Sequence, residues 1–114
     1  MGQGYFKPDA DKDIIVHWST FWDFPIAWGK LEEFTLTLEQ IERILTRGST
    51  WFDMPIDRDN PDDGLIVRLP FEGKELGGLL PYRNVLVFLE LLMQPESKER
   101  TAAVETLLIE GHWL

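Results

Sequence analysis

The sequence contains no cysteine, two histidines and no long apolar run. Without cysteine, disulfides, thiolate catalysis and cysteine-based metal sites are excluded, which fits a reducing cytosol. A membrane-spanning helix needs about 18 consecutive apolar residues, and the longest candidate, residues 85–93, is interrupted by Glu90. The first residues show no basic start followed by an apolar run, so we expect no signal peptide and a cytoplasmic protein.

Basic residues are also scarce, because 11 lysines and arginines face 20 aspartates and glutamates, for a net charge of −9. Such a charge is repelled by nucleic-acid phosphates and by anionic membrane surfaces. The bases are scattered along the chain, so we expect neither direct nucleic-acid binding nor membrane binding. The acidity instead favours a basic protein partner, with solubility alone as the other interpretation.

The length of 114 residues and the apolar content of 44% suit one domain, residues 1–114, with its own core. Residues 13–19 alternate, with both faces fairly apolar, which predicts a strand in the middle of a sheet. Residues 64–71 predict a second strand, and weaker strands are possible at Tyr5 and Trp51. Pro25 favours an irregular segment over residues 20–29, with a short strand at residues 26–28.

Three helices are predicted. Thr37 and Gln40 form a capping box before a helix that ends at Gly48. Its inward face would hold Leu38, Ile41, Ile44 and Leu45. A second helix follows Pro81 to residue 93, and a third runs over residues 98–110 and ends at Gly111.

Glycines at positions 73, 77 and 78 predict a turn or mobile loop over residues 72–80, and their spacing does not match a phosphate-binding loop. The order of elements predicts an α+β fold, with a small, mostly antiparallel sheet and about three helices packed on one face.

His17 is a candidate for chemistry because Ser19 and Asp23 lie close to it in the sequence. No G-x-S-x-G elbow accompanies them, and a half-buried strand histidine is the favoured interpretation. We therefore expect no catalytic residues and no enzyme activity. A small metal-binding or hydrolytic domain that uses His17 and the aspartates stays as an alternative.

The aspartate-rich loop is a second candidate, with Asp53, Asp57, Asp59, Asp62 and Asp63 inside eleven residues. Counted from Asp59 as a calcium loop, the third position is a proline and the twelfth is Pro70, where a glutamate is needed. We expect no metal and no cofactor. The loop is then either a solvated turn or an acidic patch that docks on a basic partner.

Aromatic residues crowd one segment and border the acidic loop. Within eleven residues lie Trp18, Phe21, Trp22, Phe24 and Trp28. Some must fill the core, and Trp22 is the one we most expect to be exposed. The predicted partner-binding residues are Trp22, Trp51, Phe52, Asp53, Asp57, Asp59, Asp62 and Asp63.

The N-terminal run YFKPDADKDIIVHWST, followed by FPIAWG, resembles the opening of small uncharacterised acidic proteins from actinobacteria and their phages. Those proteins open with Tyr-x-Lys-Pro-Asp, followed by a strand ending in Trp-Ser and a Trp-Gly turn. The matching residues here are Tyr5, Lys7, Pro8, Asp9, Trp18, Ser19, Trp28 and Gly29. The resemblance implies a cytosolic accessory protein of phage or host origin that binds another protein, and it supplies no catalytic residues.

Taken together, the sequence predicts a non-enzymatic, acidic protein-binding module. It would act as an inhibitor or accessory factor, of a phage anti-host, anti-defence or immunity type, that docks on a basic partner protein. A homo-oligomeric structural or assembly component that uses the aromatic segment as its interface is the first alternative.

Overall fold

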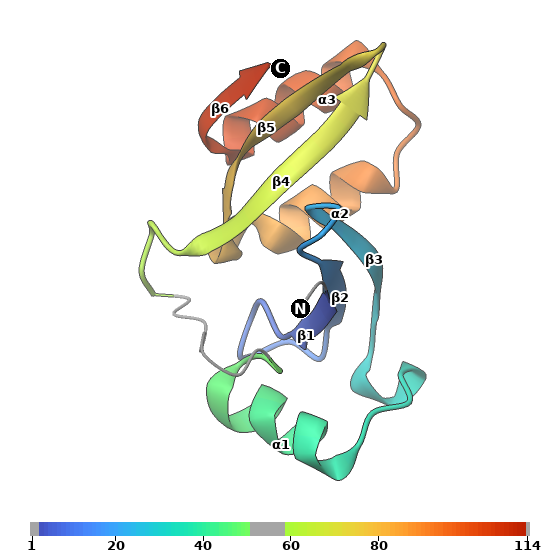
Figure 1. Cartoon of the computed structure of the whole chain (residues 1–114), viewed down its shortest axis with the longest axis vertical. Coiled ribbons are helices and arrows are strands. Elements are labelled where there is room, and N and C mark those ends of the chain that lie inside the picture. The colour runs from blue at the N-terminus through green and yellow to red at the C-terminus, as the bar shows by residue number, and fades with distance from the viewer. Residues whose placement is uncertain (1–2, 51–58, 114) are drawn as a thin grey trace.

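The computed structural model describes residues 3–50 and 59–113, and it contains two antiparallel sheets and three α-helices (Figure 1). The first sheet has the order β1 (Gln3–Phe6), β2 (Ile15–Ser19), β3 (Phe24–Gly29), and the second has the order β4 (Gly64–Phe71), β5 (Lys74–Pro81), β6 (Ile109–Trp113). The helices are α1 (Leu38–Arg47), α2 (Val85–Leu92) and α3 (Lys98–Leu107), with short 3-10 turns η1 (Leu31–Glu33) and η2 (Tyr82–Asn84). The α+β class is confirmed, with the strands divided between two sheets.

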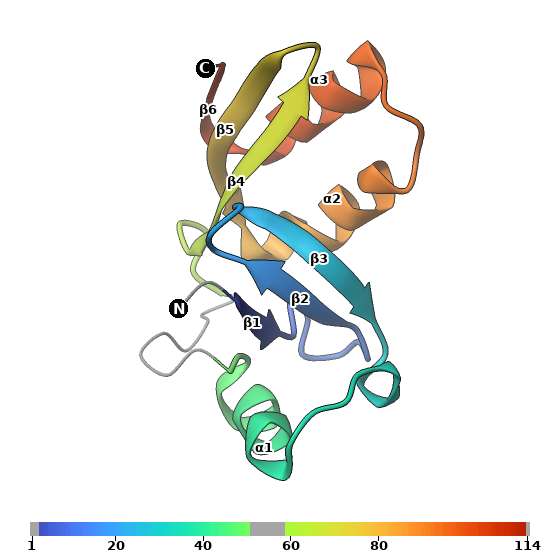
Figure 2. The same cartoon turned by 45° about the vertical axis from the view of Figure 1, so that its right-hand side comes forward.

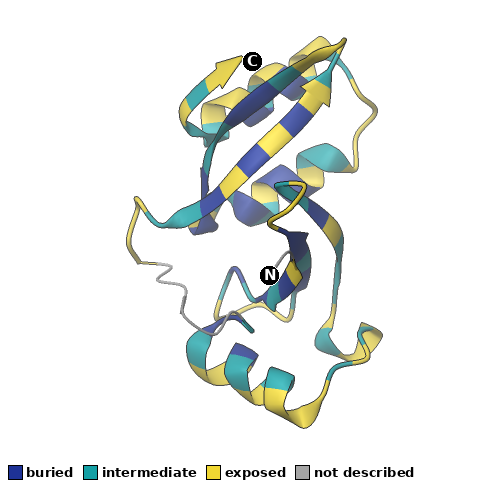
Figure 3. Cartoon of the chain, viewed as in Figure 1, coloured by how far each residue is buried: buried dark blue, intermediate teal, exposed yellow. Residues whose placement is uncertain are grey.

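One buried cluster joins the two sheets (Figure 3). Trp18 of β2 is fully buried. The centroid of its ring lies 6.1 Å from the ring centroid of Phe6 and 6.3 Å from that of Phe88 in α2. The second sheet contributes Val67 and Leu76 to the same cluster. In the described parts of the chain, no helix combines the length and apolarity that crossing a bilayer requires.

Strand β2 lies in the middle of the first sheet, as its sequence pattern predicts. In Figure 2, α2 lies above this sheet and α1 below it, which explains why both faces of β2 are apolar. Ile15 of β2 and Ile44 of α1 are each only 1% exposed. The chain after α1 is fixed to β1, since the N–H of Thr50 donates to the carbonyl oxygen of Tyr5 in β1.

Helix α1 forms where the capping box predicts it. Thr37 caps the N-terminus, and Gly48 ends the helix with a φ of 83°. The predicted inward face is wrong in part, because Leu38 is 86% exposed and Leu45 is 62% exposed. Ile44 is the buried residue of this helix. The buried apolar stripe of α1 is therefore narrower than the sequence periodicity implies.

Strand β3 is longer than the sequence predicts, since it includes Pro25. Two features accommodate the proline. Strand β3 is an edge strand, and the pairing register shifts between His17 and Trp18, so that Pro25 pairs with Trp18 and Ala27 with His17. A missing N–H is tolerated at an edge or a bulge, where no ladder hydrogen bond is lost.

The predicted loop over residues 72–80 is wrong, because most of it is β5, paired with β4 in a tight hairpin. Phe71 pairs with Lys74, so Glu72 and Gly73 form a two-residue turn. Their φ values of 49° and 77° are those of the turn that matches the twist of a hairpin. Gly77 and Gly78, read as loop residues from the sequence, lie inside the strand.

The C-terminal prediction is also wrong, because α3 ends at Leu107 and the chain then forms strand β6. Strand β6 pairs with β5, with Trp113 opposite Leu76 and Ile109 opposite Leu79. Gly111 lies within β6 and does not end the helix. This strand completes the second sheet beside α3 (Figure 1).

Candidate docking surface

Two large aromatic side chains lie exposed at the turn between β2 and β3, residues 20–23, which we call the aromatic turn. Phe21 is 73% exposed and Trp22 is 70% exposed. Their rings meet edge to face, with centroids 5.0 Å apart. Trp22 is therefore exposed as predicted, whereas Phe21 was not singled out by the sequence.

The aromatic turn is held in place by hydrogen bonds. The main-chain N–H of Trp22 donates to Oγ of the buried Ser19, over 3.0 Å. The carbonyl oxygen of Asp23 accepts from the N–H of Arg68 in β4, also over 3.0 Å. Asp23 has a φ of 54°, a left-handed conformation that aspartate tolerates better than most residues. The two rings are thus presented from a fixed backbone.

A groove of about 520 Å³ runs beside the aromatic turn. Its lining residues come from the turn, β3 and the outer face of the second sheet: Phe21, Trp22, Phe24, Arg68, Pro70 and Glu75. Arg68 and Glu75 form an ion pair, with Nε and Oε2 3.3 Å apart. The groove therefore combines aromatic walls with one balanced pair of charges.

The described residues of the aspartate-rich loop form a hydrogen-bonded turn. The N–H of Asp62 donates to Oδ1 of Asn60 over 3.0 Å, and the N–H of Asp63 donates to the carbonyl oxygen of the same residue. The carbonyl oxygen of Asp63 accepts from the N–H of Tyr82. Burial, and next the charge of Asp63, raise the pKa of Tyr82. The predicted site residues Trp51, Phe52, Asp53 and Asp57 lie outside the described residues.

Asp59 lies along the same pocket as two acidic residues that are distant in the sequence. It lines a pocket of about 280 Å³ together with Asp9 and Asp11, beside Arg83. The N–H of Asp11 donates to Oδ1 of Asp9, which fixes that turn. No sequence pattern links the two segments, so only the fold places these residues along one pocket. Trp22 does not line this pocket, so the predicted site residues Trp22 and Asp59 lie at different places on the surface.

The ring of His17 contacts side chains of the neighbouring strand β1. Its ring stacks on Tyr5, with centroids 4.3 Å apart, and Nε2 lies 3.3 Å from Oε1 of Gln3. Burial lowers the pKa of His17. The Oγ of Ser19, a sequence neighbour of His17, accepts the hydrogen bond from the N–H of Trp22. Among residues 3–50 and 59–113, no three histidine or carboxylate side chains come close enough to hold a metal ion.

Comparisons with family models, with curated proteins and with solved structures found no match for this chain. The resemblance of the N-terminal segment to acidic proteins of actinobacteria and their phages thus stays a prediction.

Proposed function

We propose that the protein is a non-enzymatic binding module, an inhibitor or accessory factor, that docks on a basic partner protein through the aromatic turn. The exposed pair Phe21 and Trp22 is the observation that carries this proposal. Tryptophan is enriched among the residues that dominate binding energy at protein interfaces, where it is buried in the centre of the contact.

The fixed backbone of the turn supports docking. Ordering a flexible loop on binding costs free energy, and a segment that is already ordered avoids that cost. Here Trp22 is tied to Ser19, and Asp23 is tied to Arg68 of the second sheet. The adjacent groove adds Pro70 and Phe24 as further apolar contact area.

The charge of the chain supports a basic partner. The net charge of −9 creates a field that attracts cationic surfaces and speeds their encounter. Asp9, Asp11 and Asp59 concentrate part of that charge in one pocket. In this proposal the field brings the partner close, and the aromatic turn supplies the contact that holds it.

The proposal is tested by affinity capture from a lysate of the source organism, at low and at high salt. The wild type is compared with the double variant Phe21→Ser/Trp22→Ser. The control is Val87→Ser, since Val87 is an exposed apolar residue on α2. We expect the wild type and the control to recover the same basic protein, less of it at high salt, and the double variant to lose it. Equal recovery by the double variant would contradict the proposal.

A second candidate is the homo-oligomer, favoured by the apolar outer face of the second sheet. Ile66 of the edge strand β4 is 55% exposed and pairs with Leu79 of β5. These side chains lie on the same face as Arg68 of the groove, so one interface could cover both. Analytical sedimentation at high protein concentration tests this candidate. If the protein sediments only as a monomer, the homo-oligomer is excluded.

A further inference from the structure

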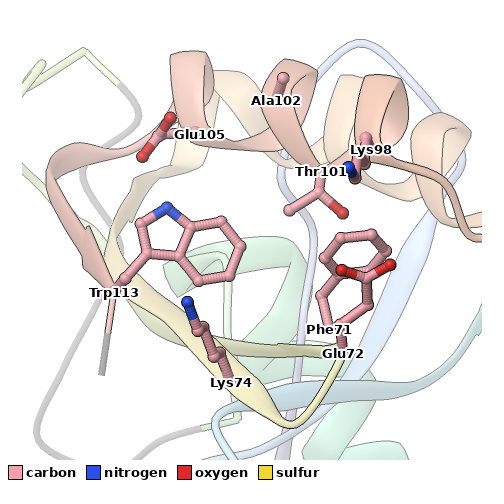
Figure 4. A pocket seen from close by; sticks show the side chains of 8 residues that line it. All are labelled: Phe71, Glu72, Lys74, Lys98, Thr101, Ala102, Glu105 and Trp113. Carbon is pink, nitrogen blue, oxygen red and sulfur yellow. The ribbon is translucent and has the colours of Figure 1, made fainter.

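A pocket of about 350 Å³ lies on the face of the second sheet that α3 covers, between α3, the β4–β5 turn and β6 (Figure 4). It shares no residue with the groove beside the aromatic turn. Its volume falls within the range of roughly 300–1,000 Å³ that is typical of small-molecule sites. The pocket is therefore a candidate site of its own, separate from the proposed docking surface.

The pocket exists because a small residue faces two large rings. Lys98, Ala102 and Glu105 follow one another at helical spacing and line it from the same side of α3. Phe71 and Trp113 line it from the second sheet. Figure 4 shows the two rings apart from each other, with the methyl group of Ala102 above the space between them.

The charges at the pocket are balanced and are not paired with each other. Lys74 and Lys98 supply two ammonium groups, and Glu72 and Glu105 supply two carboxylates. None of the four forms an ion pair with a described residue. In Figure 4 the ammonium group of Lys74 points toward the ring of Trp113, and the carboxylate of Glu72 lies on the side of Phe71. Both signs of charge thus remain available to a ligand.

These features select the chemistry of the ligand. A simple anion would gain the two lysines but would meet two carboxylates and a chain of net charge −9. A simple cation would meet two ammonium groups. A zwitterion can place its anionic group on a lysine and its cationic group on a glutamate. An apolar ring in the same molecule would pack between Phe71 and Trp113.

We propose that this pocket binds a small zwitterionic molecule with an aromatic body, of the class of aromatic amino acids. The proposal does not depend on protein docking. The zwitterion contacts oppositely charged groups through both of its charges. An analogue that has lost one charge keeps the ring contacts and loses one of these attractions.

The first test is an NMR titration of the labelled protein with three probes of equal ring size, namely L-phenylalanine, phenylacetate and phenethylamine. We expect L-phenylalanine to bind about fivefold more tightly than either singly charged probe, the scale of one partly exposed charge contact. The shifted amides should include those of Phe71, Ala102 and Trp113. Equal or tighter binding of a singly charged probe overturns the proposal, as do shifts that map elsewhere or no binding at all.

A filled pocket gives the second test. Ala102→Leu adds bulk between the rings and leaves all four charges in place. Thr106→Leu is the matched control, because Thr106 is an exposed residue of α3 that does not line the pocket. We expect Ala102→Leu to lose L-phenylalanine binding and the control to keep it. If Ala102→Leu lowers the melting temperature, Lys98→Gln replaces it, with at least a twofold loss expected. Unchanged binding in the variants, or equal loss in the control, contradicts the proposal.

Discussion

Asp23 and Arg68 link the two sheets, because the carbonyl oxygen of Asp23 accepts a hydrogen bond of 3.0 Å from the main-chain N–H of Arg68. The two residues belong to segments that are far apart in the sequence. Their contact positions the aromatic turn over the outer face of β4, and it requires the positive φ of Asp23. The placement of Trp22 therefore depends on the backbone conformation of its neighbour.

This dependence predicts unequal effects of two substitutions at Asp23. Asp23→Val should lower the free energy of unfolding by about 1–3 kcal/mol, because a β-branched residue is strained at positive φ. Asp23→Gly should change it by less than ~1 kcal/mol, since glycine adopts this conformation freely. Urea denaturation of both variants measures the difference. A valine variant as stable as the glycine variant would show that the turn adopts another conformation.

The shared core predicts a large cost for Phe88→Ala. Phe88 is fully buried and lies 6.3 Å from Trp18 and 6.2 Å from Phe24, measured between ring centroids. Its truncation should lower the free energy of unfolding by about 3–5 kcal/mol. The neighbouring Val87→Ala is the control, since Val87 is 46% exposed and its truncation should cost under ~1 kcal/mol. Similar effects of the two substitutions would argue against the buried position of Phe88.

The β4–β5 turn can be improved. Glu72 has a φ of 49°, which asparagine tolerates better than glutamate, and Gly73 follows it. Glu72→Asn creates the Asn-Gly pair that favours a two-residue hairpin turn. We expect a gain of about 0.5–1 kcal/mol in the free energy of unfolding, measured by urea denaturation. Gly73→Ala should instead destabilise the protein, because Gly73 has a φ of 77°. Destabilisation by Glu72→Asn would mean that the turn differs from the one described.

His17 predicts a pH dependence with a definite sign. Burial lowers its pKa below the ordinary value of 6.5, so the unfolded chain binds a proton on His17 more readily than the folded chain does. The contribution of His17 to the free energy of unfolding is therefore fully present above pH 6.5, and it is lost as the pH falls from there through the lowered pKa of the folded state. His17→Gln should show a smaller loss of stability than the wild type between about pH 8 and about pH 5. An identical loss in both proteins would remove His17 as the cause.

The sequence predicts the elements with strong local signals and misses those that depend on partners elsewhere. The alternation of residues 13–19 and the capping box at Thr37 were sufficient for β2 and α1. Glycines 77 and 78 indicated a loop, yet they lie in β5 because β4 and β6 pair with that strand on either side. Strand β6 follows α3 after Leu108 alone. No proline or glycine marks the end of the helix there, so no local signal in the sequence indicates the change to a strand.

Of the candidate site, the sequence predicts the exposed Trp22 but not the residues that the fold places around it. The exposure of Trp22 follows from the density of aromatic residues around Pro25, which cannot all share one buried face. The role of Arg68 and Pro70 in the groove depends on the contact between the aromatic turn and β4. The placement of Asp59 and Asp9 along one pocket likewise depends on the fold alone. Neither arrangement leaves a local pattern in the chain.

Site-specific photo-crosslinking in a lysate of the source organism tests the central claim most directly. Phe21 is replaced by the photoreactive residue p-benzoylphenylalanine, and Val87 on α2 is replaced in the same way as the control. We expect light to attach a basic protein at position 21, with a lower yield at high salt, and not at position 87. Attachment of the same proteins at both positions, or of none at position 21, would contradict docking through the aromatic turn. A crosslink between two copies of this chain would indicate the homo-oligomer instead.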